Sequence, residues 1–192
     1  MSQVLLIRHG QSTWNAEHRW QGWADPPLSA EGRISAIAFA QDLAPVGFKA
    51  IVSSNLLRAR ETAEIVAGHL KMPDPQLLPA LRERDGGDWT GKTSQEIEAS
   101  HPGWLDKWRS GEWVDPPGCE SREVLLRRSL GGIREASHPE GPTLAITHGG
   151  VLRVIEGHLG HEVTAPQNLH GLWVEVVGST IRLADHHRWP SA

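Results

Sequence analysis

The stretch LIRHGQSTWN, Leu6 to Asn15, begins in an apolar run and then turns abruptly polar. The four consecutive apolar residues from Val4 to Ile7 are typical of a short strand that is buried in a parallel sheet. Arg8, His9 and Gly10 then follow at the carboxyl end of this strand. In open α/β sheets ligands bind at that edge, so the stretch predicts both a strand and a binding site.

The rest of the chain alternates short apolar runs with helical stretches, which predicts an α/β protein built on a central sheet. The further strands expected are AIVSS at 50–54, residues 77–81 (where Pro79 opposes a strand), TLAIT at 143–147, and a closing hairpin of LWVEVV and IRLAD around Gly178-Ser179. No repeat, low-complexity tract or linker interrupts the pattern, so we expect a single domain over residues 1–192.

Helices are expected between these strands, next to residues that cap or break them. The first is capped by Ser29 and carries Ala30, Ile34, Ile37 and Ala38 on one face, and the second is capped by Ser54 or Asn55 and runs to about Gly68. A stretch from Thr93 to about Ser110 is broken near Pro102, a helix from Ser121 to Ser137 carries Leu126, Leu130 and Ile133 on one stripe, and a last helix ends at Gly160.

Charge and cysteine content exclude several classes of protein. The net charge of −4 argues against a broad nucleic-acid-binding surface, and the lone Cys119 cannot form an internal disulfide. The start, MSQVLLIRHG, has too few consecutive apolar residues for a signal peptide, and no run approaches the ~20 residues of a membrane span. We therefore expect a cytoplasmic protein with neither nucleic acid nor membrane as partner, and leave open whether it forms a homodimer.

The stretch GGDWTGKT, Gly86 to Thr93, fits the phosphate-loop pattern of nucleotide-binding proteins letter for letter. Such a loop follows an apolar strand, but here the charged residues RERD precede Gly86. Asp88 would also place a carboxylate where backbone N–H groups should surround anionic phosphates. We interpret the stretch as a glycine-rich turn, capped by Thr93 or Ser94, and not as a nucleotide site.

Three further segments carry polar residues to the edge where Arg8 and His9 lie. His148 follows the strand TLAIT, Arg58 lies in the first turn of the helix after AIVSS, and Glu83 follows the third candidate strand. Each residue alone has an ordinary structural explanation, a hydrogen-bonded histidine or a solvated arginine. Their joint arrangement at one sheet edge is what indicates a site.

These residue types together suit phosphoryl transfer. A neutral His9 can attack phosphorus and form a phosphohistidine, while Arg8 and Arg58 bind the phosphoryl oxygens by forked hydrogen bonds. Their positive charge also keeps His9 unprotonated. His148, if protonated, adds a donor where negative charge accumulates, and Glu83 can protonate the leaving alkoxide.

The chain resembles the histidine phosphatase superfamily, which also contains the cofactor-dependent phosphoglycerate mutases. LIRHGQSTWN matches its opening motif, and GWADPPLSAEG resembles the segment that follows. SSNLLRARETA matches a third motif and points to Arg58 rather than Arg60, LRERDGGDWTGKT resembles the segment with the acid at Glu83, and THGG supplies His148. The resemblance covers most of the chain. It implies a three-layer α/β/α fold with a mostly parallel mixed central sheet.

The resemblance also implies a phosphohistidine mechanism that needs no metal and no other cofactor. By the same comparison Asn15, Gln21, Gly22 and Gly149 would contact the substrate, a small phosphorylated molecule. The sequence departs from the family at three places: Gly86 stands where many members have an aromatic residue, Thr90 where many have Glu, and Cys119 where a second Gly is usual. These departures concern the pocket wall and so affect which substrate fits.

Histidine and tryptophan content leave two other interpretations open. His158 with His161, and His186 with His187, are possible zinc ligands, but neither pair comes with cysteine or a suitable set of carboxylates. Seven tryptophans fall in or between the site segments: Trp14, Trp20, Trp23, Trp89, Trp104, Trp108 and Trp113. We favour core packing for them over the alternative, an aromatic wall that excludes water and prefers substrates with an apolar part.

Three functions compete on this sequence. The first is a phosphomonoester phosphatase, the second a phosphoglycerate-type mutase, and the third a non-catalytic phosphate-binding module, which would have no need of Glu83. In the mutases that the chain resembles, a long insertion after the acid carries paired arginines, whereas residues 92–121 here number about thirty and lack such a pair. The adjacent Arg127 and Arg128 lie on a later helix and are expected to be solvated. The phosphatase is therefore the favoured prediction.

Overall fold

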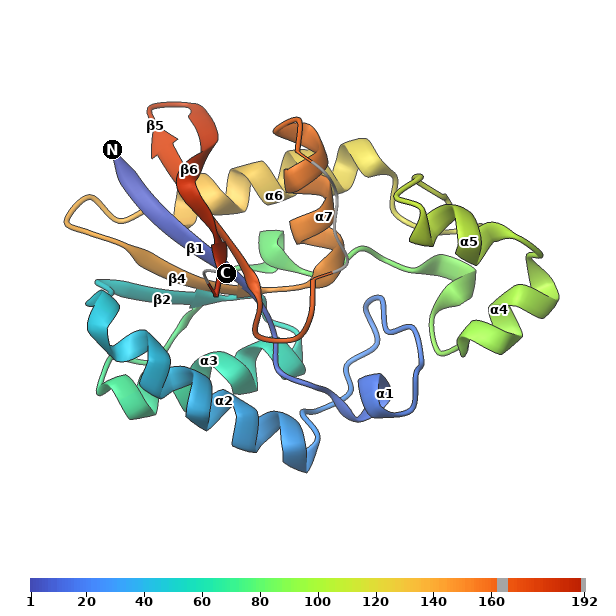
Figure 1. Ribbon diagram of the computed structural model, residues 1–192, viewed down its shortest axis with the longest axis horizontal. Coiled ribbons are helices and arrows are strands. Elements are labelled where there is room, and N and C mark those ends of the chain that lie inside the picture. Colours follow the sequence, from blue (N-terminus) through green and yellow to red (C-terminus); the bar gives the residue numbers. More distant parts are fainter. Residues whose placement is uncertain (162–165, 191–192) are drawn as a thin grey trace.

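The structure, a computed structural model, describes residues 1–161 and 166–190, with the backbone alone for residues 185–187. In this part of the chain six strands form one sheet, in the order β3-β2-β4-β1-β5-β6 (Figure 1). The parallel strands are β1 (Ser2–Arg8), β2 (Ala50–Ser53), β3 (Gln76–Leu77) and β4 (Thr143–Thr147); β5 (Gly171–Val177) and β6 (Thr180–Trp189) add an antiparallel hairpin. The mostly parallel mixed sheet predicted from the sequence is confirmed.

Helices cover both faces of this sheet and complete the predicted three layers. α2 (Ala30–Leu43) and α3 (Leu57–Leu70) lie on one face, and α6 (Arg122–Ala136) and α7 (Gly149–His158) on the other (Figure 1). Within β1, Leu5 and Ile7 pack in the core beneath α2 and α3, whereas Val4 and Leu6 pack in the core beneath α6 and α7. Burial on both faces is why this strand reads as an unbroken apolar run.

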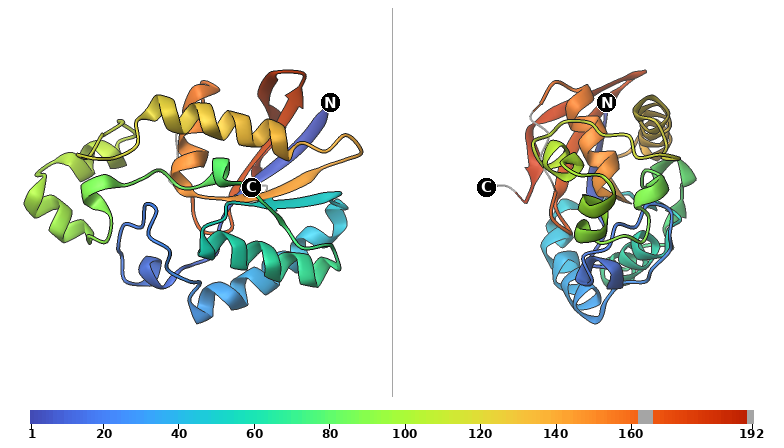
Figure 2. Two further views of the ribbon diagram at one scale, coloured as in Figure 1. Left: turned by 180° about the vertical axis from the view of Figure 1, so that it is seen from behind. Right: turned by 90° about the vertical axis from the view of Figure 1, so that its right-hand side faces the viewer.

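Shorter elements extend the molecule beyond the carboxyl edge of the parallel strands. α4 (Ser94–Ser100) and α5 (Trp104–Arg109) lie at one end, away from the sheet (Figure 2), and the sequence break near Pro102 separates them as predicted. They share a small core of their own, made of Trp89, Ile97 and Leu105. The remaining short elements are α1 (Thr13–Ala16) and the 3-10 turns η1 (Ala44–Val46), η2 (Pro79–Leu81) and η3 (Gly87–Trp89).

The buried face of α2 differs from the predicted one. Ser29 caps the helix as expected, but Ile34 and Ile37 are 62% and 38% exposed. The residues that face inward are instead Gly32, Ala36, Phe39, Ala40 and Leu43. Both sets repeat with helical spacing. The buried face of α2 is the one with small residues, which allow close approach to the neighbouring backbone. At Gly32 even a Cβ would stand 2.0 Å from the carbonyl oxygen of Gln11.

Three other details of the secondary structure also differ. α3 begins at Leu57 with no side-chain cap, so the predicted cap at Ser54 or Asn55 is wrong. The strand expected at 77–81 is only Gln76–Leu77, because Pro79 starts η2. On α6 the inward face is Leu125, Ser129, Gly132, Ile133 and Ala136, with Leu126 and Leu130 only partly buried.

Candidate active site

The carboxyl edge of the parallel strands brings together four residues, which we call the sheet-edge cluster: Arg8, His9, Arg58 and His148. Arg8 ends β1 and His9 follows it, His148 follows β4 and begins α7, and Arg58 lies in the first turn of α3. The rings of His9 and His148 lie edge to face with their centroids 5.1 Å apart. All four come from segments that the sequence placed at this edge.

His9 is fixed in a form that leaves one ring nitrogen as a nucleophile. Its Nδ1 lies 2.6 Å from the carbonyl oxygen of Gly10, an acceptor only, so Nδ1 carries the proton. Nε2 then accepts a hydrogen bond of 3.1 Å from Nε of Arg58. Burial, and then the positive charges of Arg58 and Arg8, hold the pKa of His9 well below its usual value. The imidazole is therefore neutral near pH 7.

Arg58 is almost fully buried and held from three sides. Besides the bond to His9, its Nη1 donates to the carbonyl of Ala24 at 2.9 Å and its Nη2 to the carbonyl of Gly22 at 3.0 Å. Burial lowers its pKa to about 10, although Glu83 and Asp25 oppose the shift. The guanidinium remains charged at neutral pH. The backbone carbonyls of Ala24 and Gly22 therefore fix the position of the guanidinium.

Arg8 points into the same pocket from the other side. Its Nη1 donates to the carbonyl of Pro166 at 2.8 Å, and its buried Nε has no partner within the described residues. Burial lowers the pKa of Arg8, and Glu83 opposes this shift. A buried guanidinium nitrogen without a partner is costly unless a ligand supplies one.

His148 differs from the expectation that it is protonated. Burial, followed by the charges of Arg58 and His9, lowers its pKa well below the usual value, so the ring is neutral near pH 7. Nε2 lies 2.8 Å from Oγ of Ser54, and that hydroxyl already accepts the N–H of Leu56. In the tautomer in which the Ser54 hydroxyl donates to Nε2, the proton of His148 lies on Nδ1. Nδ1 has no partner in the described part of the chain and can donate.

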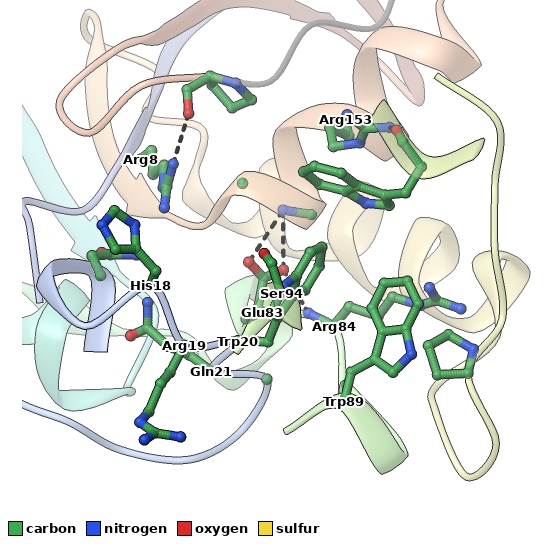
Figure 3. A pocket seen from close by; sticks show the side chains of 18 of the residues that line it. Arg8, His18, Arg19, Trp20, Gln21, Glu83, Arg84, Trp89, Ser94 and Arg153 are labelled. Carbon is green, nitrogen blue, oxygen red and sulfur yellow. Dashed lines mark hydrogen bonds between the residues drawn. The ribbon is translucent and has the colours of Figure 1, made fainter. Parts of the chain in front are cut away.

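Glu83 reaches the pocket from the loop after η2 and is held by backbone N–H groups. Its Oε1 accepts from Arg84 N at 2.7 Å and from Gly150 N at 3.1 Å, and its Oε2 lies 3.2 Å from the same Gly150 nitrogen (Figure 3). A side chain at Gly150 would leave no room, since its Cβ would stand 2.2 Å from Oε1. The first turn of α7 thus positions the carboxyl group.

Arg128 contradicts the expectation that it is solvated. From α6 it donates to the carbonyls of Ala80 (3.0 Å), Arg82 (2.6 Å) and Glu83 (2.7 Å), and it forms a two-bond ion pair with Glu120 at 2.7 and 2.6 Å. Its neighbour Arg127 is exposed, as predicted. The Arg128 guanidinium therefore fixes the backbone of the loop that carries Glu83.

Arg8, His9, Arg58 and Glu83 line a pocket of about 320 Å³, and the fully buried His148 lies behind His9, outside the lining. The other four residues predicted from the resemblance, Asn15, Gln21, Gly22 and Gly149, all line it. Oε1 of the buried Gln21 accepts from Ser12 Oγ at 2.7 Å, which leaves its amide nitrogen as the group that can donate to a ligand. Gly22 has φ +49°, and a Cβ there would lie 2.7 Å from Gly86 N, so glycine is required on both counts.

The far side of the pocket is a second group of residues, which we call the outer wall: Trp20, Trp89, Trp108, Trp113 and Arg153. Trp20 meets both Trp89 and Trp108 edge to face, with centroids 4.8 Å apart in each pair. Of the seven tryptophans near the site segments, these four line the pocket, and Trp89 also belongs to the small core under α4 and α5. Core packing and an aromatic wall are thus combined.

The sequence analysis missed Arg153. It lies four residues after Gly149 on α7, a spacing that puts both side chains on one helical face, and this was the signal that could have found it. It is 6% exposed and stacks on Trp108, with the guanidinium carbon 4.4 Å from the ring centroid.

The turn that imitates a phosphate loop lacks the context of one. Residues 82–85, which precede it, form no strand, and η3 lies within it. Thr93 caps α4 through a capping box with Glu96, which confirms the predicted turn and cap. The three family departures also lie here: Gly86 packs against Thr90 and Gly22, and Cys119 Sγ lies 3.0 Å from Nη2 of Arg84.

Other candidate features can be placed within the described ranges 1–161 and 166–190. No group of three or more His, Cys, Asp or Glu that could hold a metal ion lies there, and no helix in them is long and apolar enough to cross a membrane. His158 ends α7, and His161 follows it. The side chains of His186 and His187 lie outside the described residues.

Known proteins of one family are similar to this chain over nearly its whole length. Residues 4–189 match the model of the histidine phosphatase superfamily (branch 1). The chain is 34% identical over 192 residues to a glucosyl-3-phosphoglycerate phosphatase of Mycolicibacterium vanbaalenii, covering 93% of this chain and 85% of that protein. It is 32% identical over 182 residues to a 2,3-bisphosphoglycerate-dependent phosphoglycerate mutase 2 of Gloeobacter violaceus, covering 91% of this chain and 82% of that protein. Its structure is similar to that of a mycobacterial glucosyl-3-phosphoglycerate phosphatase in complex with VO3, with a TM-score of 0.81 at 30% identity, covering 96% of this chain and 97% of that one.

Proposed function

The chain belongs to the histidine phosphatase superfamily (branch 1), and we propose that within it the protein is a phosphomonoester hydrolase that acts on a small phosphorylated metabolite through a phosphohistidine at His9. The observation that carries the proposal is the state of His9. Its Nδ1 is bound to the Gly10 carbonyl, and its neutral Nε2 lies in a pocket lined by Arg8, Arg58 and Glu83. A nucleophile, an acid and the cations for a phosphoryl group thus share one cavity.

In the proposed first step, the phosphoryl group of the ester binds between Arg8 and Arg58. The Arg58 Nε–H that now bonds Nε2 of His9 moves to a phosphoryl oxygen, which frees the nitrogen lone pair to attack phosphorus. As the P–Nε2 bond forms, the P–O bond to the alcohol breaks, and protonated Glu83 gives its proton to the leaving oxygen. Nδ1–H of His148 supplies a neutral donor to the developing charge.

In the second step water replaces the alcohol. Glu83, now a carboxylate, accepts a proton from the water as its oxygen bonds phosphorus, and the electron pair of the P–Nε2 bond returns to His9. Inorganic phosphate leaves, and both residues regain their starting forms. The N–H groups of Arg84 and Gly150 hold the Glu83 carboxylate in place for this role as base. Asn15, Gln21, Gly22 and Gly149 complete the binding surface.

Hydrolysis is favoured over mutase activity by the cations around the pocket. A mutase must retain a bisphosphorylated intermediate, so it needs further free cations and a segment that keeps water out. Among the described residues, Arg19 and Arg84 line the pocket but are paired with Glu17 and Asp115 respectively. Arg128 is bound to backbone carbonyls and to Glu120. The single guanidinium of Arg153 is too little for a second phosphate dianion.

The mutase remains the second candidate, since relatives of similar identity bear that name. The discriminating experiment supplies 3-phosphoglycerate with a trace of 2,3-bisphosphoglycerate and follows both products. We expect free phosphate to accumulate. Rapid formation of 2-phosphoglycerate with little free phosphate would establish the mutase instead. A panel of metabolite phosphates, with phosphate release as the readout, then identifies the substrate of the hydrolase.

A further inference from the structure

Arg153 is a buried charge inside the pocket that the proposed chemistry does not use. It is 6% exposed, and burial lowers its pKa, although Glu156 and Glu83 oppose the shift. Among the described residues its guanidinium makes one hydrogen bond, from Nη2 to the carbonyl oxygen of Trp108 at 3.1 Å. Glu156, the nearest acidic neighbour on α7, forms an ion pair of 3.0 Å with Arg188. Burying a charge without a direct ionic partner is unfavourable, which suggests that a ligand completes the pairing.

The position of Arg153 relates it to the alcohol part of the substrate. Gly149, Gly150 and Arg153 share one face of α7. A Cβ at Gly149 would lie 3.8 Å from Nε of Arg8, and Gly150 N–H binds Glu83, so this face passes from the phosphoryl site to the acid and then to Arg153. In Figure 3 Glu83 lies between Arg8 and Arg153. Since Glu83 protonates the leaving oxygen, Arg153 lies on the leaving-group side, about one helical turn or ~5.4 Å further along the helix.

The setting of the guanidinium indicates a planar monoanion. Trp108 covers one face of it, so the N–H groups in its plane are the ones that can meet a ligand. A planar guanidinium edge matches the two oxygens of a carboxylate. The adjoining surfaces of Trp20, Trp108 and Trp113 are apolar and suit a carbon skeleton between the two anionic ends.

We propose that Arg153, stacked on Trp108, binds a carboxylate carried by the alcohol part of the substrate, so that the site selects phosphate esters of hydroxy acids. This inference rests on the proposed hydrolase function. It adds a specificity-determining contact on the leaving-group side of the pocket, separate from the residues that bind the phosphoryl group.

The test uses two esters that differ only at this end: 3-phosphoglycerate has a carboxylate where glycerol 3-phosphate has a hydroxymethyl group. We expect the wild type to prefer the carboxylate ester in kcat/KM by about 10- to 100-fold, the value of a charge-assisted hydrogen-bonded contact. Arg153→Met should remove most of that preference, mainly through KM, and Arg153→Lys should keep part of it. Arg109→Met is the matched control, because Arg109 is an exposed cation on the same helix as Trp108.

Hydrolysis of nitrophenyl phosphate separates this inference from the proposed function. That ester has no carboxylate, so Arg153→Met should lower kcat/KM for it far less than for 3-phosphoglycerate. If the wild type hydrolyses nitrophenyl phosphate but does not prefer the carboxylate ester, or if Arg153→Met retains the preference, the carboxylate site is wrong while the hydrolase stands. If the wild type hydrolyses no ester at all, the proposed function itself is wrong.

A second measurement covers the case in which the Arg153 variants do not fold. On the wild type, 4-phosphonobutyrate, which has the same number of atoms between phosphorus and carboxylate as 3-phosphoglycerate, is compared with butylphosphonate as an inhibitor of nitrophenyl phosphate hydrolysis. The compound with the carboxylate should inhibit about tenfold more strongly or better. Equal inhibition by the two compounds would contradict the carboxylate site without any substitution in the chain.

Discussion

Three residues of the sheet-edge cluster, Arg8, His9 and Arg58, line the same pocket as the outer wall, but the two regions are built in different ways. Arg8, His9 and His148 follow directly from β1 and β4, in segments whose main chain is fixed by the central sheet. The outer wall comes largely from short helices and turns between residues 84 and 121, with a small core of its own. In the function proposed above, the chemistry rests on residues fixed by the sheet, and substrate choice rests on loops and short helices, which can vary without disturbing the sheet.

The largest effect is expected where the sheet-edge cluster loses its nucleophile. His9→Ala should lower phosphatase activity by at least about 10⁴-fold, because His9 carries the ring nitrogen that the structure holds beside Arg58 in the pocket. With labelled ester, an alkali-stable adduct should appear on the wild type and vanish in the variant. Label that persists in His9→Ala would assign the nucleophile elsewhere.

Glu83 lies where the two regions meet, and its effect should depend on the leaving group. An alkyl alkoxide needs a proton, whereas nitrophenolate scarcely does. Glu83→Gln should therefore slow alkyl phosphates by ~10²–10⁴-fold and nitrophenyl phosphate far less. Equal losses on both esters would show that Glu83 positions the substrate rather than protonating it.

Arg128 tests whether the loop that carries Glu83 needs support from α6. Arg128→Ala removes three bonds to the carbonyls of residues 80, 82 and 83, so the acid should lose its alignment. We expect a loss of roughly 10- to 100-fold on alkyl phosphates and a smaller loss on nitrophenyl phosphate. Combined with Glu83→Gln, the change should add little, since both act through the same step. Arg127→Ala, an exposed neighbour, serves as control; a uniform loss on both esters would indicate a merely structural role for Arg128.

The two buried histidines of the sheet-edge cluster should make the free energy of unfolding depend on pH. The pKa values of His9 and His148 are lowered in the folded protein, so the unfolded chain binds more protons as the pH falls below about 6.5. Each histidine then costs up to about 1.4 kcal/mol of unfolding free energy per pH unit. In urea titrations between pH 7.5 and 5.5, His9→Ala should give a shallower fall than the wild type. Identical slopes for the wild type and His9→Ala would contradict the burial argument.

The smallest effect is expected from the phosphate-loop imitation beside the outer wall. Lys92→Ala should change phosphatase activity by less than about twofold, because the turn around it lacks a preceding strand. A metal chelator should likewise leave the activity intact. Tight, magnesium-dependent binding of ATP that disappears in Lys92→Ala would restore the nucleotide interpretation.

Local signals in the sequence determined the framework of this protein. The apolar run at Val4 to Ile7, TLAIT at 143–147 and the caps at Ser29, Thr93 and Ser121 each depend on residues close together in the chain. Strand ends then identified His9 and His148, because parallel strands deliver their carboxyl ends to one edge. These patterns predicted an α/β protein with a binding site at this sheet edge, and the family resemblance supplied the three layers and the choice of Arg58 over Arg60.

Tertiary packing decided what local patterns leave open. Two apolar stripes on α2 have the same period, and the buried one is the stripe that packs Phe39 and Leu43 in the core and brings Gly32 against the Gln11 carbonyl. Arg128 meets carbonyl groups 45 to 48 residues earlier in the chain, and no periodicity on α6 encodes that contact. The neutral state of His148 depends on burial and on the neighbouring cations, and the role inferred for Arg153 depends on its burial against Trp108. Burial and long-range hydrogen bonds arise only when distant segments meet, so the sequence predicted the reacting groups while the fold fixed their charge, support and surroundings.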